Sequence, residues 1–75
     1  MKINTADITI YDRNTQKTVL WNEFLPLSEE ERFTTEEEVK DYLLLDRRFC
    51  ESYKDTAIDV EYSWGNESIN FTWER

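Results

Sequence analysis

Residues 57–74 read AIDVEYSWGNESINFTWE, and this stretch decides the fold. Apolar and polar residues alternate on both sides of Gly65-Asn66, a dipeptide that favours a two-residue hairpin turn. Such a turn pairs apolar residues across the strands: Tyr62 with Ile69, Val60 with Phe71, and Ile58 with Trp73. Because side chains alternate between the two faces of a strand, all these apolar residues share one face. The stretch therefore predicts an antiparallel hairpin with one buried face and one polar face.

A second hairpin is predicted near the start of the chain. Residues 7–12 (DITIYD) alternate like a half-buried strand, and residues 17–24 (KTVLWNEF) follow as its partner. The polar segment 13–16 (RNTQ) predicts a turn between them. A four-residue loop sets two pairs, Ile10 opposite Val19 and Ile8 opposite Trp21. Residues 25–27 (LPL) are expected to leave the sheet, because proline cannot donate to a strand ladder.

The middle of the chain predicts a helix from about Thr35 to Tyr53. Thr34 and Thr35 are each followed three residues later by a glutamate, the spacing of a capping box. Apolar residues then recur at helical spacing, namely Val39, Tyr42, Leu43, Phe49, Cys50 and Tyr53. A short helical turn capped by Ser28 is expected before this helix. The order strand, strand, helix, strand, strand predicts one α+β domain over residues 1–75, in which an antiparallel sheet packs the helix on its apolar face.

The residue types that most catalytic sites need are missing from the chain. There is no histidine, so nucleophilic pairs of the Ser-His and Cys-His types are excluded. A single glycine cannot build a phosphate-binding loop, and a single cysteine without histidine cannot build a zinc site. Spacing places that cysteine, Cys50, among the core residues of the helix. Carboxylates remain, but so short a chain rarely forms a cleft around them, so an enzyme, a metal site and a cofactor are not expected.

Charge and cysteine content indicate a compartment and a kind of partner. Seventeen acidic residues outnumber nine basic ones, which gives a net charge of -8. Such a chain repels nucleic acid and anionic membranes and attracts basic proteins. One cysteine suits a reducing cytosol, and no apolar leader or run of about 20 apolar residues is present. The sequence therefore predicts a cytoplasmic protein with a basic protein partner and without direct contact to nucleic acid or membrane.

The acidic residues concentrate in two segments, and this clustering is the main functional signal. Residues 23–41 hold eight acids and two bases, whereas residues 57–74 hold four acids and no base. Carboxylates about 6.7 Å apart along a strand, or on successive helical turns, form rows that imitate nucleic-acid phosphates. Tyr11 or Phe24 would serve as exposed aromatic anchors. The candidate partner-binding residues are Glu29, Glu30, Glu31, Glu36, Glu37, Asp41, Asp59 and Glu61.

In length, acidity and lack of catalytic residues, the chain resembles a functional class more than a family. This class comprises small acidic inhibitors from phages and mobile elements that block restriction or CRISPR nucleases. The resemblance implies a non-enzymatic inhibitor that docks a carboxylate-rich face into a basic nucleic-acid-binding site. Alternatively, the chain is a protein-interaction module or homodimeric accessory protein, since acids in a first helical turn stabilise the helix and aid solubility by themselves. One continuous acidic face would favour mimicry, and evenly scattered acids would not.

Overall fold

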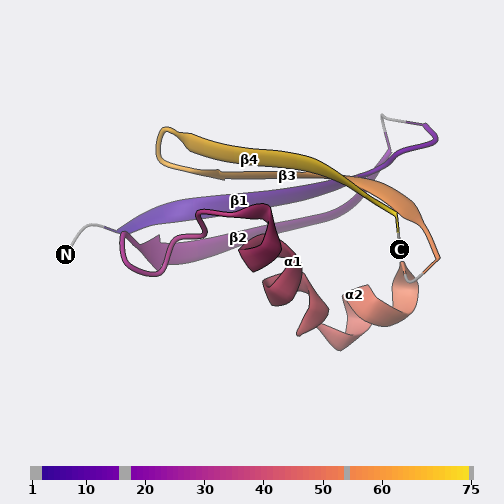
Figure 1. Ribbon diagram of the computed structural model, residues 1–75, viewed down its shortest axis with the longest axis horizontal. Coiled ribbons are helices and arrows are strands. Elements are labelled where there is room, and N and C mark those ends of the chain that lie inside the picture. The colour runs from indigo at the N-terminus through magenta and orange to yellow at the C-terminus, as the bar shows by residue number, and fades with distance from the viewer. Residues whose placement is uncertain (1–2, 16–17, 54, 75) are drawn as a thin grey trace.

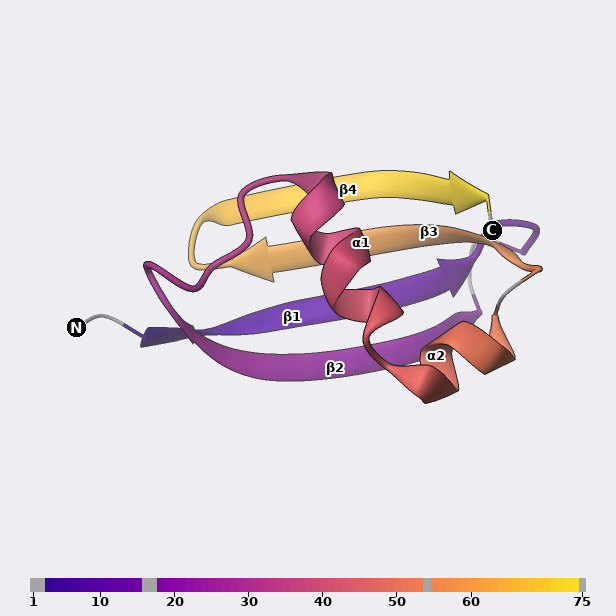
Figure 2. The ribbon, with the colours of Figure 1, turned by 60° about the horizontal axis from the view of Figure 1, so that its bottom comes forward.

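The protein forms one four-stranded antiparallel sheet with two short helices across one of its faces (Figure 1 and Figure 2). This computed structural model describes residues 3–15, 18–53 and 55–74. The elements are β1 (Ile3–Asp12), β2 (Val19–Ser28), α1 (Glu36–Leu44), α2 (Arg47–Ser52), β3 (Ala57–Trp64) and β4 (Glu67–Glu74). Across the sheet the strands lie in the order β2-β1-β3-β4. The predicted α+β class is therefore confirmed.

The C-terminal hairpin has the register that the alternation predicts. Its cross-strand pairs are Tyr62 with Ile69, Val60 with Phe71, and Ile58 with Trp73. Gly65 turns the chain at a φ of 57°, a backbone conformation that glycine adopts without a steric penalty. The apolar side chains of β3 are buried and those of β4 are half-buried. The predicted apolar face of this hairpin is thus part of the core face of the sheet.

The N-terminal hairpin forms, but its predicted register is wrong. The pairs differ from those expected: Ile10 lies opposite Trp21 instead of Val19, and Ile8 lies opposite Glu23 instead of Trp21. The connection is longer than four residues, because β1 ends at Asp12 and β2 begins at Val19. A register irregularity beside Tyr11 shifts the pairing further. Gln16 and Lys17, which the prediction placed in the turn and at the start of the second strand, lie outside the described residues.

Residues 25–27 stay in the sheet, contrary to the prediction that the proline would end the strand. β2 continues to Ser28, with Pro26 opposite Thr5. Because β2 is an edge strand, only one of its sides carries a ladder, and proline is tolerated at such an edge. Leu25 and Leu27 remain half-buried against the core, which adds apolar area to this strand.

The long helix predicted over residues 35–53 is divided into α1 and α2 at Asp46. The Asp46 carboxylate accepts hydrogen bonds from the backbone N–H groups of Arg48 at 2.9 Å and Phe49 at 3.2 Å. An aspartate in this position satisfies N–H groups that the start of a helix leaves unpaired, and so it stabilises a new helix start. Phe49 of the second helix is also fully buried in the core, at 0% exposure. The apolar spacing of the sequence therefore continues across the break and gives no sign of it.

Both helices contribute to the core on the apolar face of the sheet. One hydrophobic cluster joins buried residues of β1, β3, α1 and α2, among them Ile8, Val60, Val39 and Phe49. Half-buried aromatic residues of β2 and β4 pack around this cluster. Neither helix covers the opposite face, which we call the open sheet face (Figure 1). The sheet thus separates a helix-covered side of the molecule from an open side.

Candidate functional site

The predicted partner-binding carboxylates divide between two surfaces. The first, which we call the turn–helix surface, comprises Glu29, Glu30 and Glu31 after β2, and Glu36, Glu37, Glu38 and Asp41 of α1. Glu38 was not among the predicted residues. The second is the open sheet face, which carries Asp59 and Glu61 of β3. The acids form neither one continuous face nor an even scatter. The two surfaces therefore differ in their geometry and in their neighbouring residues.

Ser28 and Glu31 hold the turn that opens the turn–helix surface. The Glu31 carboxylate accepts a hydrogen bond from the Ser28 backbone N–H at 2.9 Å. The Ser28 hydroxyl accepts one in return from the Glu31 backbone N–H at 3.3 Å. The bond from the Ser28 backbone, followed by the contribution of its side chain, lowers the pKa of Glu31. Ser28 caps a hydrogen-bonded turn as expected, but residues 29–32 do not form a helix.

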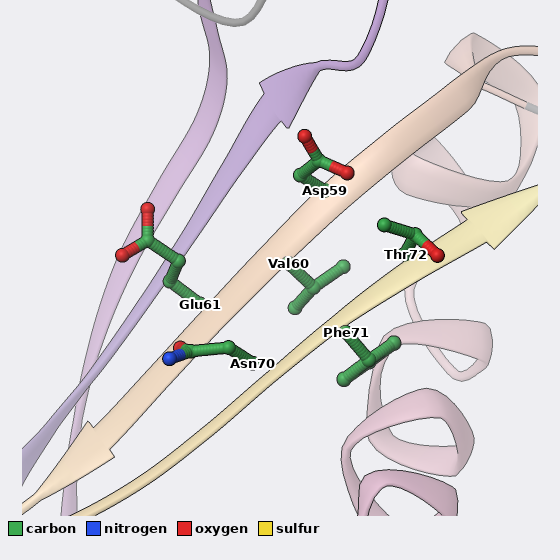
Figure 3. A pocket seen from close by; sticks show the side chains of 6 residues that line it. All are labelled: Asp59, Val60, Glu61, Asn70, Phe71 and Thr72. Atoms are coloured by element: carbon green, nitrogen blue, oxygen red, sulfur yellow. The ribbon is translucent and has the colours of Figure 1, made fainter.

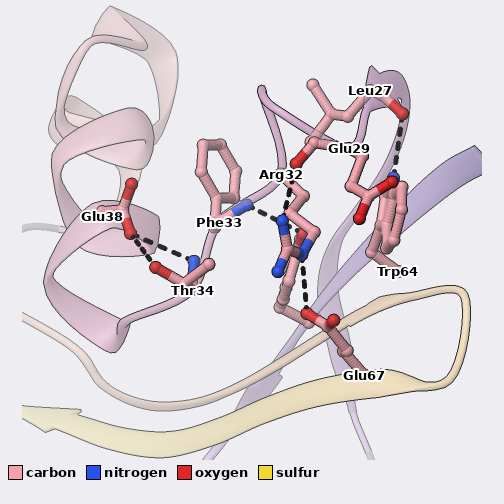
Figure 4. A network of polar contacts seen from close by, with 9 residues as sticks. Leu27, Glu29, Arg32, Phe33, Thr34, Glu38, Trp64 and Glu67 are labelled. Atoms are coloured by element: carbon pink, nitrogen blue, oxygen red, sulfur yellow. Dashed lines mark hydrogen bonds and ion pairs between the residues drawn. The ribbon is translucent and has the colours of Figure 1, made fainter. Parts of the chain in front are cut away.

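Thr35 caps the N-terminus of α1, and the preceding Thr34 donates to the carboxylate of Glu38 in its first turn. The Thr35 hydroxyl accepts a hydrogen bond from the Glu38 backbone N–H at 3.2 Å. The Glu38 carboxylate accepts from the Thr34 hydroxyl at 2.7 Å and from the Thr34 backbone N–H at 3.1 Å (Figure 4). The Thr34 side chain first, and then its backbone, lower the pKa of Glu38. The predicted capping box is confirmed, and it fixes the first turn of acids.

Both basic residues of this segment lie over aromatic rings of the sheet. The Arg32 guanidinium lies 5.7 Å from the ring centroid of Trp64, and its Nε donates to the Glu67 carboxylate at 3.0 Å (Figure 4). The Lys40 ammonium lies 5.4 Å from the ring centroid of Phe71. Arg32 is therefore directed to Trp64 and Glu67 of the sheet, whereas Lys40 lies between the Phe71 ring and Glu36 of its own helix.

Several acids of the turn–helix surface are exposed and have no ion pair with a described base. Glu36 is paired with Lys40 at 3.6 Å. Glu30, Glu37 and Asp41 are exposed, and no base among the described residues lies within ion-pair distance of them. A partner's cations would meet these carboxylates without first displacing an internal ion pair.

A shallow apolar groove of about 390 Å³ lies within the same surface. Its lining consists of Glu31, Phe33, Glu38, Asp41, Tyr42 and Leu45, and we call it the Phe33–Tyr42 groove. The ring centroids of Phe33 and Tyr42 are 5.5 Å apart. Leu45 is 84% exposed, so its apolar side chain is available for contact at the groove. Burial, assisted by the adjacent Glu23 carboxylate, raises the pKa of Tyr42 to about 12, so this phenol is neutral at physiological pH.

Sequence reasoning missed this groove, although one signal for it was present. Tyr42 was assigned to the core side of the helix, and Leu45 received no role. Three leucines follow one another at positions 43–45, and a helix with 3.6 residues per turn cannot direct three successive side chains into one core. Leu43 is fully buried, whereas Leu44 and Leu45 are 47% and 84% exposed. Of the two exposed leucines, Leu45 lines the groove.

The open sheet face holds the remaining predicted residues. Asp59 and Glu61 stand beside polar side chains of β4 (Figure 3). The Glu61 carboxylate is the main cause of a raised pKa of the Tyr11 phenol. Both predicted aromatic anchors, Tyr11 and Phe24, belong to this face by register, and Phe24 is 62% exposed. The two predicted anchors therefore lie on a different face from the turn–helix surface. The aromatic residues of the turn–helix surface are Phe33 and Tyr42.

The described residues hold no group of three or more His, Cys, Asp or Glu side chains placed to bind a metal ion. Within the same residues, no helix has the length and apolar character to cross a membrane. Comparison with protein-family models, curated proteins and solved structures gave no significant match. The two acidic surfaces are therefore the features of the described residues that bear on function.

Proposed function

We propose that the protein is a non-enzymatic inhibitor that acts in the cytoplasm and docks its turn–helix surface into the basic nucleic-acid-binding site of a partner protein. The placement of charge carries this proposal. Arg32 and Lys40 lie over rings of the sheet, while the exposed acids of this surface face solvent. Acids that served only solubility would gain from interspersed bases, which also limit self-repulsion.

The local geometry favours docking as a unit. Glu37 and Asp41 are four residues apart on α1, so their side chains lie on neighbouring turns with Cβ atoms about 5–6 Å apart. Glu30 is a further exposed acid in the turn before α1. The hydrogen bonds of Glu31 and Glu38 hold both ends of this segment in place. A surface that is ordered before binding loses less conformational entropy when a partner docks.

The class of partner follows from electrostatics. A net charge of -8 repels DNA and RNA, so the contact is expected with a protein and not with nucleic acid. A cleft that binds phosphates with Lys and Arg also attracts carboxylates, because both groups are anions. A nuclease blocked by a phage or mobile-element inhibitor of the anti-restriction or anti-CRISPR kind would be such a partner.

An affinity capture tests the proposal. The protein immobilised on beads is expected to retain a nucleic-acid-binding protein from a bacterial lysate at low salt. Excess duplex DNA or RNA should then release the captured protein, because nucleic acid competes for the same basic site, and raised salt should release it as well. Recovery of no nucleic-acid-binding protein, or a captured protein that excess nucleic acid leaves in place, would overturn the proposal.

A second candidate, self-association, is favoured by one observation on the open sheet face. Ile3, Val19 and Phe24 are 58%, 54% and 62% exposed, and the strand register places all three on this face. Two copies that packed these side chains together would remove their apolar area from water. Sedimentation velocity should then show a dimer that forms with rising concentration and is lost in Phe24→Ser. A monomer at every concentration would exclude this candidate.

A further inference from the structure

We infer that the Phe33–Tyr42 groove receives the side chain of an arginine from the partner protein. This inference deepens the proposed function and rests on it for the nature of the partner. The bound group is a guanidinium, and its place on the turn–helix surface is this groove. The protein's own basic residues supply the pattern from which the occupant is identified.

Three of these basic side chains occupy places of one kind. Each lies over an aromatic ring and pairs with an acid: Arg32 with Trp64 and Glu67, Lys40 with Phe71 and Glu36, and Arg48 with Trp21 and Asp46. The cations lie 5.7, 5.4 and 5.5 Å from the respective ring centroids. A ring face attracts a cation through its quadrupole, and the neighbouring acid adds Coulombic attraction.

The groove combines the same two components without a base of its own. Phe33 and Tyr42 provide the rings, and Glu31, Glu38 and Asp41 provide the acids. Within the described parts of the chain, no base lies over either ring or forms an ion pair with these acids. A cation supplied by another molecule would complete the arrangement.

Hydrogen bonds hold two acids of the groove, Glu31 and Glu38, and all three of its acids retain capacity to accept further hydrogen bonds. Glu31 uses its Oε1 atom for the bond from Ser28, and Glu38 uses Oε1 for the bonds from Thr34. Their Oε2 atoms accept no hydrogen bond from the described residues. The carboxylate of Asp41 is likewise left to solvent within these residues, and an ionised carboxylate offers about four acceptor sites. The groove therefore presents oriented acceptors to an incoming fork of donors.

An arginine matches this lining better than the other candidate side chains. Its aliphatic stem can lie against Leu45, while its planar guanidinium stacks on a ring and directs several N–H donors to the carboxylates. A lysine has no plane to stack on a ring and no fork to share between two carboxylates. An apolar side chain would shield Glu38 and Asp41 from water without pairing them. Arginine is also a residue that nucleic-acid-binding sites use to contact phosphates.

An NMR titration of the whole chain with the peptide acetyl-Gly-Arg-Gly-amide tests the inference without any partner. We expect the backbone amide signals of Phe33, Tyr42 and Leu45 to shift, with a Kd on the order of 1 mM. The citrulline peptide keeps the shape and loses the charge, whereas the lysine peptide keeps the charge and loses the planar fork. Each should bind about tenfold more weakly than the arginine peptide.

Two exposed positions of the lining provide variants that leave the core intact. Leu45→Ala and Asp41→Asn should each weaken binding of the arginine peptide by about threefold or more. Leu44→Ala is the matched control, because this neighbouring leucine is also exposed but does not line the groove. Its affinity for the peptide should equal that of the unchanged protein.

Equal affinity for the arginine and citrulline peptides would overturn the inference, as would shifts confined to the open sheet face. Failure of the proposed function has a different signature. Arginine-peptide binding in the groove, with no nucleic-acid-binding protein captured from lysate, refutes the proposed partner and leaves the groove assignment standing. Capture of such a protein, without arginine-peptide binding, refutes the groove assignment alone.

Discussion

The backbone N–H of Phe33 donates a hydrogen bond to the phenolic oxygen of Tyr62 at 3.1 Å, and the two ring centroids lie 5.3 Å apart. Tyr62 belongs to β3 and is 1% exposed. This contact ties the segment between the turn and α1 to the buried centre of the sheet. The position of the turn–helix surface therefore depends on the core directly beneath it.

Replacement of Tyr62 by Phe should weaken this tie while the ring stays in place. The Phe33 N–H loses its acceptor, which is expected to lower the free energy of unfolding by about 1–2 kcal/mol. Urea denaturation measures the loss. Hydrogen exchange should show faster exchange at Phe33 than in the unchanged protein. An unfolding midpoint equal to that of the unchanged protein would contradict the role of this bond.

Replacement of Phe49 by Ala should damage the core severely. Phe49 is 0% exposed and packs against the rings of Trp21, Tyr53 and Trp73. Loss of a buried phenylalanine side chain costs about 3–5 kcal/mol, which is enough to unfold many domains of this size. Phe24→Ala is the matched control, because Phe24 is 62% exposed and should change stability by less than about 0.5 kcal/mol. Circular dichroism during thermal unfolding compares the two variants.

Replacement of Asp46 by Ala should destabilise α2 by removing its cap. The N–H groups of Arg48 and Phe49 lose their acceptor, and an N-cap of this kind contributes about 1 kcal/mol. Asp41→Ala removes the same side chain from the interior of α1 and serves as the control. Equal stability of the two variants in urea would show that Asp46 is not what starts the second helix.

The carboxyl of Glu38 should make stability depend on acid pH. Its pKa lies below the ordinary value of 4.5, because the Thr34 side chain and backbone donate to the carboxylate. A group whose folded-state pKa is lowered stabilises the fold above its unfolded pKa, and this contribution is lost as pH falls through the folded-state pKa. The difference in urea midpoint between the unchanged protein and Glu38→Gln should be constant above about pH 5 and shrink below 4.5. A difference that does not change with pH would exclude this linkage.

Local patterns predicted the parts of the fold that local forces determine. The hairpin over residues 57–74 followed from alternation and from Gly65-Asn66, and its register is as expected. The break at Asp46 was missed, because a side chain that caps a new helix does not disturb the apolar spacing on either side of it. The register of the first hairpin was wrong, since it depends on the length of a connection that polarity alone does not specify. Residues 25–27 were misplaced because the edge position of β2 follows only from the order of all four strands.

The candidate site was predicted in part. The acids and the capping box were visible in the sequence. The division of the acids between two faces could not be predicted, because it depends on how the sheet is assembled. The places of Arg32 and Lys40 could not be predicted, because the rings that they cover are more than thirty residues away in the chain. Their placement over these rings leaves Glu30, Glu37 and Asp41 of the turn–helix surface without an ion pair to a described base.

The most direct test of the central claim compares two variants that change the net charge equally. Glu37→Gln with Asp41→Asn alters the turn–helix surface, whereas Asp59→Asn with Glu61→Gln alters the open sheet face. Calorimetric titration against the nucleic-acid-binding partner captured from lysate measures the Kd of each. We predict that the first variant binds at least about tenfold more weakly and that the second binds within about twofold of the unchanged protein. Equal losses for both variants, or a larger loss for the second, would contradict docking through the turn–helix surface.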